Sequence, residues 1–396
     1  MKTSSAAQME PMLPSGGKES LAELSKQIFL HAGRLSAQVP AEKTQRQIAE
    51  VVRMMNSYYS NLIEGHKTYP REIEKALHND FSGNKEAKHN QLLSVAHIAV
   101  ERMMETKVPE ELNLFSRDFL SWIHREFFKR LPDELRMSFT KSGKPYEVYP
   151  GEIRTFNVDV GRHTLIDFRD IPKFLQAFEE RYGNQKVLPT DRLIAIAASH
   201  HRLAWIHPFG DGNGRVARLF SHALLLREEI GGCGLWTLSR GLARAKNDYF
   251  AYLNNADRQR INDLDGRGNL SEKYLVEFCE FFLKTILDQI QFMEKTLRLA
   301  ELENGIVFYT SRVERIFGKD EERGRRLLIA ALHHGEVRRG ELAAITSKGE
   351  TTARKILQKA LDAGLLASGT PKGPVRLAFP AKVLDHYFPG LYVEGS

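Results

Sequence analysis

The chain lacks the features that mark secreted, disulfide-linked and membrane-spanning proteins. It has only two cysteines in 396 residues, Cys233 and Cys279, and they do not have metal-ligand spacing. A reducing compartment, the cytoplasm, is therefore expected, and a disulfide between the two is disfavoured. No apolar run approaches the roughly 18 residues that cross a bilayer, and no apolar signal-peptide core follows the N-terminus. The sequence thus gives no reason to expect a membrane partner.

Two common phosphate-binding signatures are missing as well. The chain contains neither the GxxxxGK[ST] segment of P-loop proteins nor a protein-kinase signature. Its 42% hydrophobic and 27% charged residues are typical of a globular protein. The net charge of +7 is compatible with nucleotide or nucleic-acid partners and requires neither.

The stretch His207–Arg218, HPFGDGNGRVAR, supplies a different kind of anion site. Apolar runs at 193–206 and 216–226 predict a helix on each side, so the stretch is a loop that leads into a helix N-terminus. The free N–H groups and the positive dipole end of such a terminus bind anions. Arg215 and Arg218 are spaced so that both can face one side of the second helix.

The residue types in this stretch predict phosphate chemistry beside a base. His207 can accept a proton near neutral pH. Asp211 can hold Mg²⁺, which commonly takes one or two carboxylates together with phosphate oxygens. The segment Gly212, Asn213, Gly214 lets the backbone approach an oxyanion. With the two arginines it would stabilise charge that develops on a leaving phosphate.

A β-hairpin is predicted ahead of this stretch, at about 152–168. β-branched and aromatic residues are frequent there, and Gly161 is the expected turn. An isolated two-stranded ribbon is marginal in water. We therefore expect this hairpin to rest on the helical core or on a ligand.

The stretch matches every specified position of HPFx[DE]GNGRxxR, and the chain resembles the Fic family over about residues 45–310. The resemblance implies a mainly α fold, a helical bundle with a small β-hairpin flap. It implies an adenylyltransferase that moves AMP from ATP to a Ser, Thr or Tyr hydroxyl of a protein, including the chain itself. Many relatives dimerise, so a homodimer is the expected assembly.

The resemblance gives each motif residue a role. His207 would be the catalytic base and Asp211 the Mg²⁺ ligand. Residues 212–214 would form the anion cradle, Arg215 would contact the phosphates, and Arg218 would hold the γ-phosphate.

Residues outside the motif are assigned by the same resemblance. The hairpin would dock a target segment by strand addition. Its candidate docking residues are Thr155, Asn157, Val158 and Val160. Relatives often place a Tyr and an Asn at the adenine, and the candidates here are Tyr249, Tyr252 and Asn255. Core packing explains either tyrosine equally well.

An N-terminal segment resembles the family's inhibitory motif, [ST]xxxE[GN]. Ser60 and Glu64 are one helical turn apart, and Gly65 can end that helix. A carboxylate at Glu64 would pair with Arg218 and compete with the γ-phosphate, which implies auto-inhibition. In some relatives the same glutamate assists removal of AMP from the modified protein, so this reverse activity is an alternative.

The chain is expected to divide into a disordered tail at 1–18, an N-terminal helical region at 19–110, a Fic core at 111–310 and a C-terminal module at 319–396. The module is predicted to be a winged helix, because three short helices precede a hairpin. Residues 323–376 hold 11 Lys/Arg against 4 Asp/Glu.

This basic module supports a second hypothesis, a DNA-binding regulator with a nucleotide-sensing core. The helix near 351–359 could contact DNA phosphates. The candidate cations are Lys348, Arg354, Lys355 and Lys359. Protein contacts or dimer packing are the alternative roles of the module.

Overall fold

A computed structural model describes residues 5–39, 41–107, 112–140, 143–158, 166–183, 188–230 and 234–392. Over these residues the protein is mainly helical, as the apolar periodicity of the sequence predicts. Its strands form two separate two-stranded ribbons. No described helix has the length and apolar composition that a bilayer crossing requires.

The helices before the His207 stretch are α1 (Lys18–Gln38), α2 (Glu42–Ile63), α3 (Pro70–Leu77), α4 (Lys85–Lys107), α5 (Arg117–Phe128), α6 (Ile171–Gly183) and α7 (Pro189–Ile206). Those that follow it are α8 (Asn213–Arg227), α9 (Leu238–Arg244), α10 (Lys246–Ala256), α11 (Glu272–Thr296) and α12 (Leu299–Phe308). Helices α9 and α10 are separate, as are α11 and α12, because Ala245 and Arg298 leave the helical conformation.

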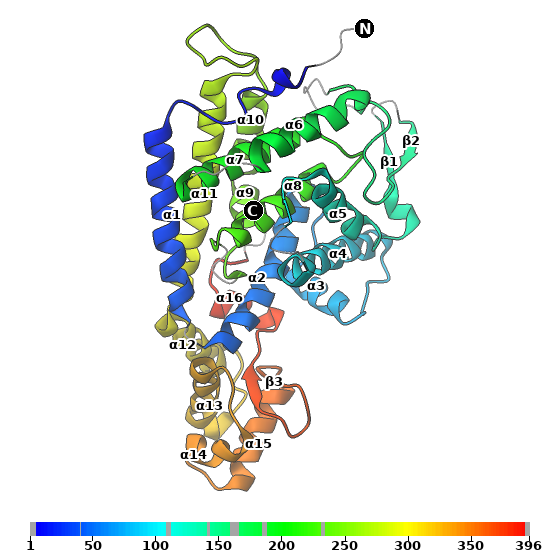
Figure 1. Cartoon of the computed structure of the whole chain (residues 1–396). Coiled ribbons are helices and arrows are strands. Elements are labelled where there is room, and N and C mark those ends of the chain that lie inside the picture. The colour runs from blue at the N-terminus through cyan, green and yellow to red at the C-terminus, as the bar shows by residue number, and fades with distance from the viewer. Residues whose placement is uncertain are drawn as a thin grey trace.

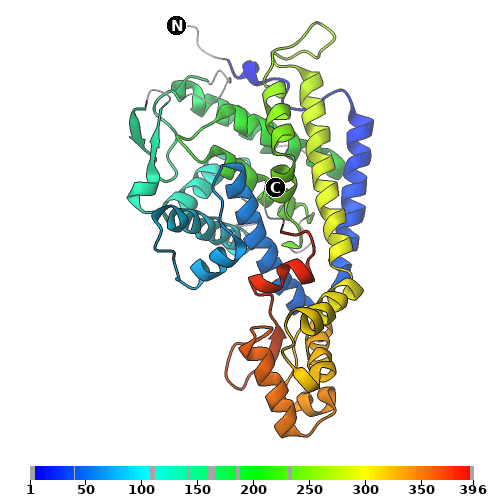
Figure 2. The same cartoon turned by 180° about the vertical axis from the view of Figure 1, so that it is seen from behind.

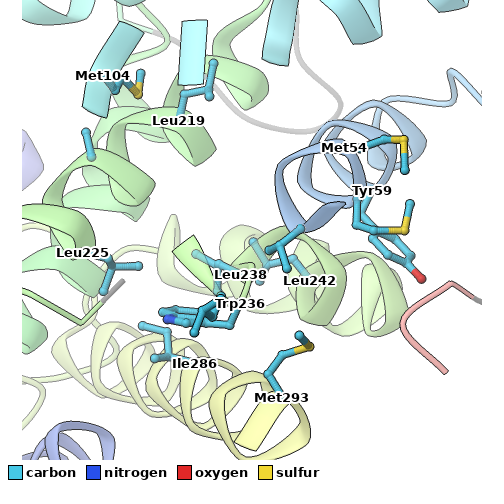
Figure 3. Packing of buried hydrophobic residues seen from close by; sticks show 14 of the residues in the cluster. Met54, Tyr59, Met104, Leu219, Leu225, Trp236, Leu238, Leu242, Ile286 and Met293 are labelled. Carbon is cyan, nitrogen blue, oxygen red and sulfur yellow. The ribbon is translucent and has the colours of Figure 1, made fainter. Parts of the chain in front are cut away.

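Helix α2 runs through the middle of the molecule and joins its parts. It packs on α4 on one side and on α9 on the other, and its N-terminal end reaches the C-terminal module (Figures 1 and 2). Helices α1 and α11 lie side by side along one flank. In the core, Tyr59 of α2 lies near Leu242 of α9 and Met293 of α11 (Figure 3). Each fully buried apolar side chain of this kind contributes about 1.5–3 kcal/mol.

The N-terminal tail is ordered where the structure describes it, contrary to the prediction of disorder for residues 1–18. Met9 and Met12 are buried. The carbonyl of Pro11 accepts hydrogen bonds from Arg202 Nε at 3.1 Å and from its NH2 at 2.7 Å. The carbonyl of Glu10 accepts one from Leu270 N at 2.8 Å. The prediction was wrong because these bonds are all to residues distant in sequence, and the local composition carries no sign of them.

The C-terminal module protrudes from one end of the molecule (Figure 1). Its elements are α13 (Glu321–His334), α14 (Leu342–Thr346), α15 (Glu350–Asp362), β3 (Leu366–Ser368) and β4 (Val375–Leu377), followed by α16 (Leu384–Tyr387). The two strands are antiparallel, with Leu366 opposite Leu377. This order of helices and strands is the one expected from the sequence, and the winged-helix assignment stays a prediction.

Two of the four candidate DNA-binding cations have protein partners. Lys359 Nζ donates to the carbonyl of Phe317 at 3.2 Å, and Arg354 pairs with Glu350 at 2.9 Å. Glu350 offsets part of the charge of Arg354, whereas Lys359 keeps its charge but is directed to a carbonyl oxygen of the protein.

The predicted hairpin at 152–168 is displaced along the chain. The ribbon near the His207 stretch consists of β1 (Met137–Phe139) and β2 (Pro145–Glu147), with Met137 opposite Glu147. Residues 152–158 and 166–168 do not form a strand, so Thr155, Asn157 and Val158 are loop residues. Val160 lies outside the described residues.

Candidate active site

The loop between α7 and α8 begins and ends with residues in the left-handed region. His207 has a φ of 51° and Gly212 a φ of 77°. A Cβ added at Gly212 would lie 2.5 Å from Cε2 of Phe128, so this position requires glycine for its φ and for space. Gly212 is the N-cap of α8, which places the N-terminus of α8 directly behind the loop.

Each of the five loop carbonyls from residue 207 to residue 211 accepts a hydrogen bond, four of them from residues outside the His207–Arg218 stretch. The donors, in order, are Arg154 Nε (2.9 Å), Arg154 N (2.9 Å), Asn213 Nδ2 (2.9 Å), Tyr146 OH (2.8 Å) and His124 Nε2 (3.3 Å). In a trans peptide the N–H points opposite to the carbonyl. The N–H groups of Gly210 and Asp211 therefore turn away from these donors, an arrangement suited to an anion.

His124 is an uncharged side chain that lies between the His207 loop and the backbone at Gly151. Its ring stacks on Phe209 at 4.1 Å and on Phe128 at 4.4 Å between centroids. Its Nδ1 accepts from the N–H of Gly151 at 2.8 Å, so Nε2 carries the proton that is donated to Asp211 O. Burial lowers the pKa of His124 to about 3 and keeps the ring uncharged.

Arg218 connects the motif helix to α2. Its Nε donates to Ser60 Oγ and its NH2 to Ser60 O, both at 2.9 Å. The same NH2 lies 2.6 Å from Oε1 of Glu64. The guanidinium is buried and the Glu64 side chain is 32% exposed. The structure thus brings Ser60 and Glu64 of the predicted inhibitory segment into contact with Arg218.

The Glu64 carboxylate lies on the N-terminus of α8, where an anion is expected. A Cβ added at Gly214 would overlap Oε1 of Glu64, so glycine at this position permits the approach. Burial alone would raise the pKa of Glu64, but the attraction of Arg218 and Arg215 outweighs it and holds the pKa below its ordinary value. The group is therefore an anion at neutral pH.

A pocket of about 200 Å³ opens beside this carboxylate. It is lined by His207, Gly214, Arg218, Glu64 and Tyr249, together with other residues of α7 and α10. Small-molecule pockets are commonly about 300–1,000 Å³. The pocket is small for a nucleotide while Glu64 forms part of its wall.

Comparison with known proteins identifies the domain that contains the His207–Arg218 stretch. Residues 114–225 match the model of the Fic/DOC family. The chain therefore carries a Fic/DOC family domain. It is 27% identical over 207 residues to the "Protein adenylyltransferase Fic" of Nematostella vectensis, a match that spans 52% of this chain and only 43% of that relative.

Two solved structures share the fold. A Fic family protein from Desulfovibrio desulfuricans G20 superposes with a TM-score of 0.54 at 18% identity, over 91% of this chain and 96% of that one. "Fic-1 (aa134 - 508) from C. elegans" superposes with a TM-score of 0.55 at 17% identity, over 71% and 74% of the two chains. At these identities the similarity establishes a Fic-type helical fold and nothing finer.

Asp211 is the only carboxylate in the His207–Arg218 stretch, and its side chain is open enough to contact a cation. Its side chain is 44% exposed. Its Oδ1 accepts from Gly212 N at 2.5 Å and lies 3.5 Å from Arg215 NH2. Arg215 itself is buried over the ring of Phe127, 5.0 Å from its centroid. One open carboxylate beside an anion site fits Mg²⁺, which takes its remaining ligands from phosphate and water.

The candidate adenine residues separate in the structure. Tyr249 lines the pocket, where its OH hydrogen-bonds to His200 Nε2 at 2.7 Å and burial raises its pKa to about 12. Tyr252 instead stacks on Phe281 at 4.8 Å and lines a different hollow. Asn255 is not among the pocket residues. Helix α10 turns another face to the pocket, with Tyr249, Phe250, Leu253, Asn254 and, just beyond its end, Asp257.

A second charged cluster lies deeper, between α2, α4 and α8. Oxygens of Glu101 and Glu105 and a nitrogen of His222 lie within 4.8 Å of one another, a group that could hold a metal ion. Arg53 already supplies a cation there. Its NH2 bonds both oxygens of Glu105 at 2.5 and 2.6 Å, and its Nε lies 3.9 Å from Glu101. No sequence pattern marks these residues, because they are scattered over three helices.

Glu101 keeps a proton at neutral pH in spite of Arg53. Burial raises its pKa to about 8, and the attraction of Arg53 opposes this rise without cancelling it. Arg53 is shared with Glu50 and Glu105, which take part of its charge. The amide of Asn56 donates to Glu101 Oε2 at 2.7 Å.

Proposed function

We propose that the chain is a protein adenylyltransferase, and that the arrangement described above is its auto-inhibited state. The observation that carries the proposal is the Glu64 carboxylate on the anion cradle of α8, in contact with Arg218 and beside His207. A site that attracts a carboxylate in this way also suits a phosphate. The name of the Nematostella relative gives the same reaction class.

In the proposed reaction the hydroxyl oxygen of a Ser, Thr or Tyr side chain attacks the α-phosphorus of ATP. The bond from this phosphorus to its bridging oxygen breaks, and pyrophosphate leaves. His207 accepts the proton of the attacking hydroxyl. The N-terminus of α8, Arg215 and Arg218 hold the phosphates, and a Mg²⁺ ion at Asp211 would neutralise part of their charge.

Glu64 and the terminal phosphate of ATP compete for one guanidinium. Arg218 is buried, and two of its hydrogen bonds go to Ser60, so it cannot swing to meet a second anion elsewhere. While Glu64 holds Arg218, the triphosphate cannot extend along α8 in the pose that transfer needs. Removal of the carboxylate leaves Ser60 to orient Arg218 and opens the cradle.

The proposal is tested with ATP labelled on the α-phosphate, Mg²⁺ and a cell lysate. We expect Glu64→Gly to label itself or a lysate protein much more strongly than the unaltered chain does. The double variant Glu64→Gly/His207→Ala should bind ATP without transferring label. Glu72→Gln, which alters a half-exposed glutamate paired with Lys75, serves as the matched control and should behave as the unaltered chain.

A folded Glu64→Gly protein that binds ATP and labels nothing would contradict the proposal. Label from γ-phosphate in place of α-phosphate would point to a different transferred group. Peptide mapping of the labelled product identifies the target residue and its protein. Whether the active form is a homodimer stays a prediction, to be measured by sedimentation of the same samples.

A further inference from the structure

Arg154 is a buried cation whose described hydrogen-bond acceptors are all neutral. It is 4% exposed. Its Nε donates to His207 O at 2.9 Å, its NH1 to Phe156 O at 3.0 Å and its NH2 to Ile166 O at 2.9 Å. Burial lowers its pKa to about 10, which leaves it charged at neutral pH. Placing a charge in such surroundings is costly, so the contacts that it makes need an explanation beyond packing.

The contact with His207 bears on the backbone of the proposed base. His207 has a left-handed φ of 51°, a conformation that costs a non-glycine residue about 1 kcal/mol or more. Such a residue keeps this conformation only if its neighbours hold it. Arg154 does so twice, through Nε on His207 O and through its backbone N–H on Pro208 O at 2.9 Å.

The same guanidinium ties two other points of the chain to His207. Phe156 lies two residues after Arg154, and Ile166 lies just before α6. Asn157 Oδ1, which accepts from Phe168 N at 3.0 Å, joins these two points a second time. One planar, five-donor group thus fixes the segment before α6 and the end of α7 in one geometry. A lysine, with a single nitrogen, cannot reproduce this.

We infer that Arg154 is a positioning residue that sets the imidazole of His207 for proton transfer. The inference rests on the proposed function, in which His207 is the base. Arg154 does not line the pocket with Glu64 and Arg218, so its role is separate from nucleotide binding. Its loss should therefore slow the chemical step and leave the affinity for ATP unchanged, since the α8 cradle and Arg218 remain.

The test uses the full chain with Glu64→Gly as the active background. Arg154→Met removes the charge and the donors, and Arg154→Lys keeps the charge. Arg169→Met is the matched control, because Arg169 is an exposed arginine of the same region that pairs with Asp167. We expect kcat to fall by about tenfold or more in both Arg154 variants. The Kd of ATP should change less than twofold, and the control should match the background.

Two further readouts separate positioning from general loosening. Added ethylguanidinium should restore part of the kcat of Arg154→Met and should not affect the control. In an NMR titration, the pKa of the His207 imidazole should shift in Arg154→Met and stay unchanged in Arg169→Met. Because the titration needs no substrate, it tests the positioning role even if Glu64→Gly transfers nothing, an outcome that would count against the proposed function alone.

An unchanged kcat in a folded Arg154→Met protein would overturn the inference. A loss of kcat accompanied by an equal loss of ATP affinity, with no rescue by ethylguanidinium, would also overturn it. If Arg154→Met does not fold, Arg154→Lys decides, and a kcat equal to the background would refute the role.

Discussion

Two charged contacts of helix α2 have opposite polarity and different surroundings. At its C-terminal end α2 contributes the carboxylate of Glu64, and α8 contributes Arg218. Three turns earlier α2 contributes Arg53, and α4 contributes Glu101 and Glu105. The Glu64 and Glu105 side chains are both 32% exposed, but Arg53 also faces Glu101, whose side chain is only 4% exposed.

The number of partners gives the two contacts different consequences. Arg53 faces the carboxyl groups of Glu50, Glu101 and Glu105, so it stays held if one of these contacts opens. A carboxylate at a pocket edge can leave to solvent, and another anion can then take its place on the same guanidinium. We therefore regard the Arg53 cluster as the fixed anchor of α2 and the Glu64 contact as its releasable end.

The largest expected effect is on AMP transfer and comes from removing the Glu64 contact, the releasable end of α2. In Glu64→Gly we expect AMP transfer to rise by about tenfold or more, since one strong charge-assisted contact of at least about 1.4 kcal/mol no longer opposes ATP. The free energy of unfolding should change by only about 1 kcal/mol, as for other partly exposed pairs. Initial rates with labelled ATP and urea unfolding measure the two quantities. A large loss of stability without gain of activity would remove the distinction between the two ends.

The next largest effect is on stability and comes from removing Arg53, the centre of the anchor. Arg53→Met removes the cation that pairs with Glu105 and faces the protonated Glu101, and we expect a loss of about 1–3 kcal/mol in the free energy of unfolding. Arg46→Met, on the same helix, removes an arginine whose side chain is 76% exposed and paired with Glu42. It should cost less than about 0.5 kcal/mol. Equal stability of the two variants in urea would show that the cluster is not an anchor.

A smaller effect is the pH dependence of stability that arises from the titration of Glu101 in the anchor. The pKa of Glu101 is raised to about 8 in the folded protein and is about 4.3 in the unfolded chain, so folding takes up a proton between these values. The stability that this supplies is complete below about pH 4 and is lost as the pH rises towards 8. Glu101→Gln cannot ionise and should melt a few degrees higher than the unaltered chain at pH 8 to 9, with no such gain at pH 5.

The matched control for this titration lies on the same helix. Glu86→Gln changes an exposed residue of α4 and should leave the pH dependence of the melting temperature as it is. A Glu101→Gln protein whose melting curve follows the unaltered chain at every pH would mean that Glu101 is ionised in the folded state.

The smallest effect concerns the link between α2 and the C-terminal segment. Tyr59 lies one residue before Ser60 on α2. Its OH donates to the carbonyl of Leu391 at 2.9 Å. Tyr59→Phe should lower the free energy of unfolding by about 1 kcal/mol. Its AMP transfer should stay far below that of Glu64→Gly, because the carboxylate remains. Tyr69→Phe, at an exposed tyrosine, is the control in the same urea titration.

The candidate site was predictable where its residues are close in sequence. The His207–Arg218 stretch carries its base, its cradle and its arginines within one loop and one helix turn, and the spacing of Ser60 and Glu64 follows helical geometry. The helical class follows from apolar periodicity in the same way. These features depend on local backbone geometry, which a sequence pattern reports directly.

Other features were missed because they depend on distant partners. The β-branched residues at 152–158 suggested a strand, but the bonds of Arg154 to His207 and Ile166 hold this segment as a loop. His124 had no pattern to mark it, and only its stacking on Phe209 shows its role. Tyr252 was as good a candidate as Tyr249 until the helix face turned to the pocket was known.

The sequence by itself determined that this chain forms helices around a loop suited to phosphates beside a histidine. The tertiary structure decided how that loop is held and what lies in it. The outside donors to its carbonyls come from Arg154, Tyr146 and His124, which are 53, 64 and 87 residues from their acceptors, and the carboxylate on its cradle comes from 154 residues before Arg218. No local pattern specifies contacts at such separations, because they form only when the packing of α2, α5 and α8 brings the donors and acceptors together.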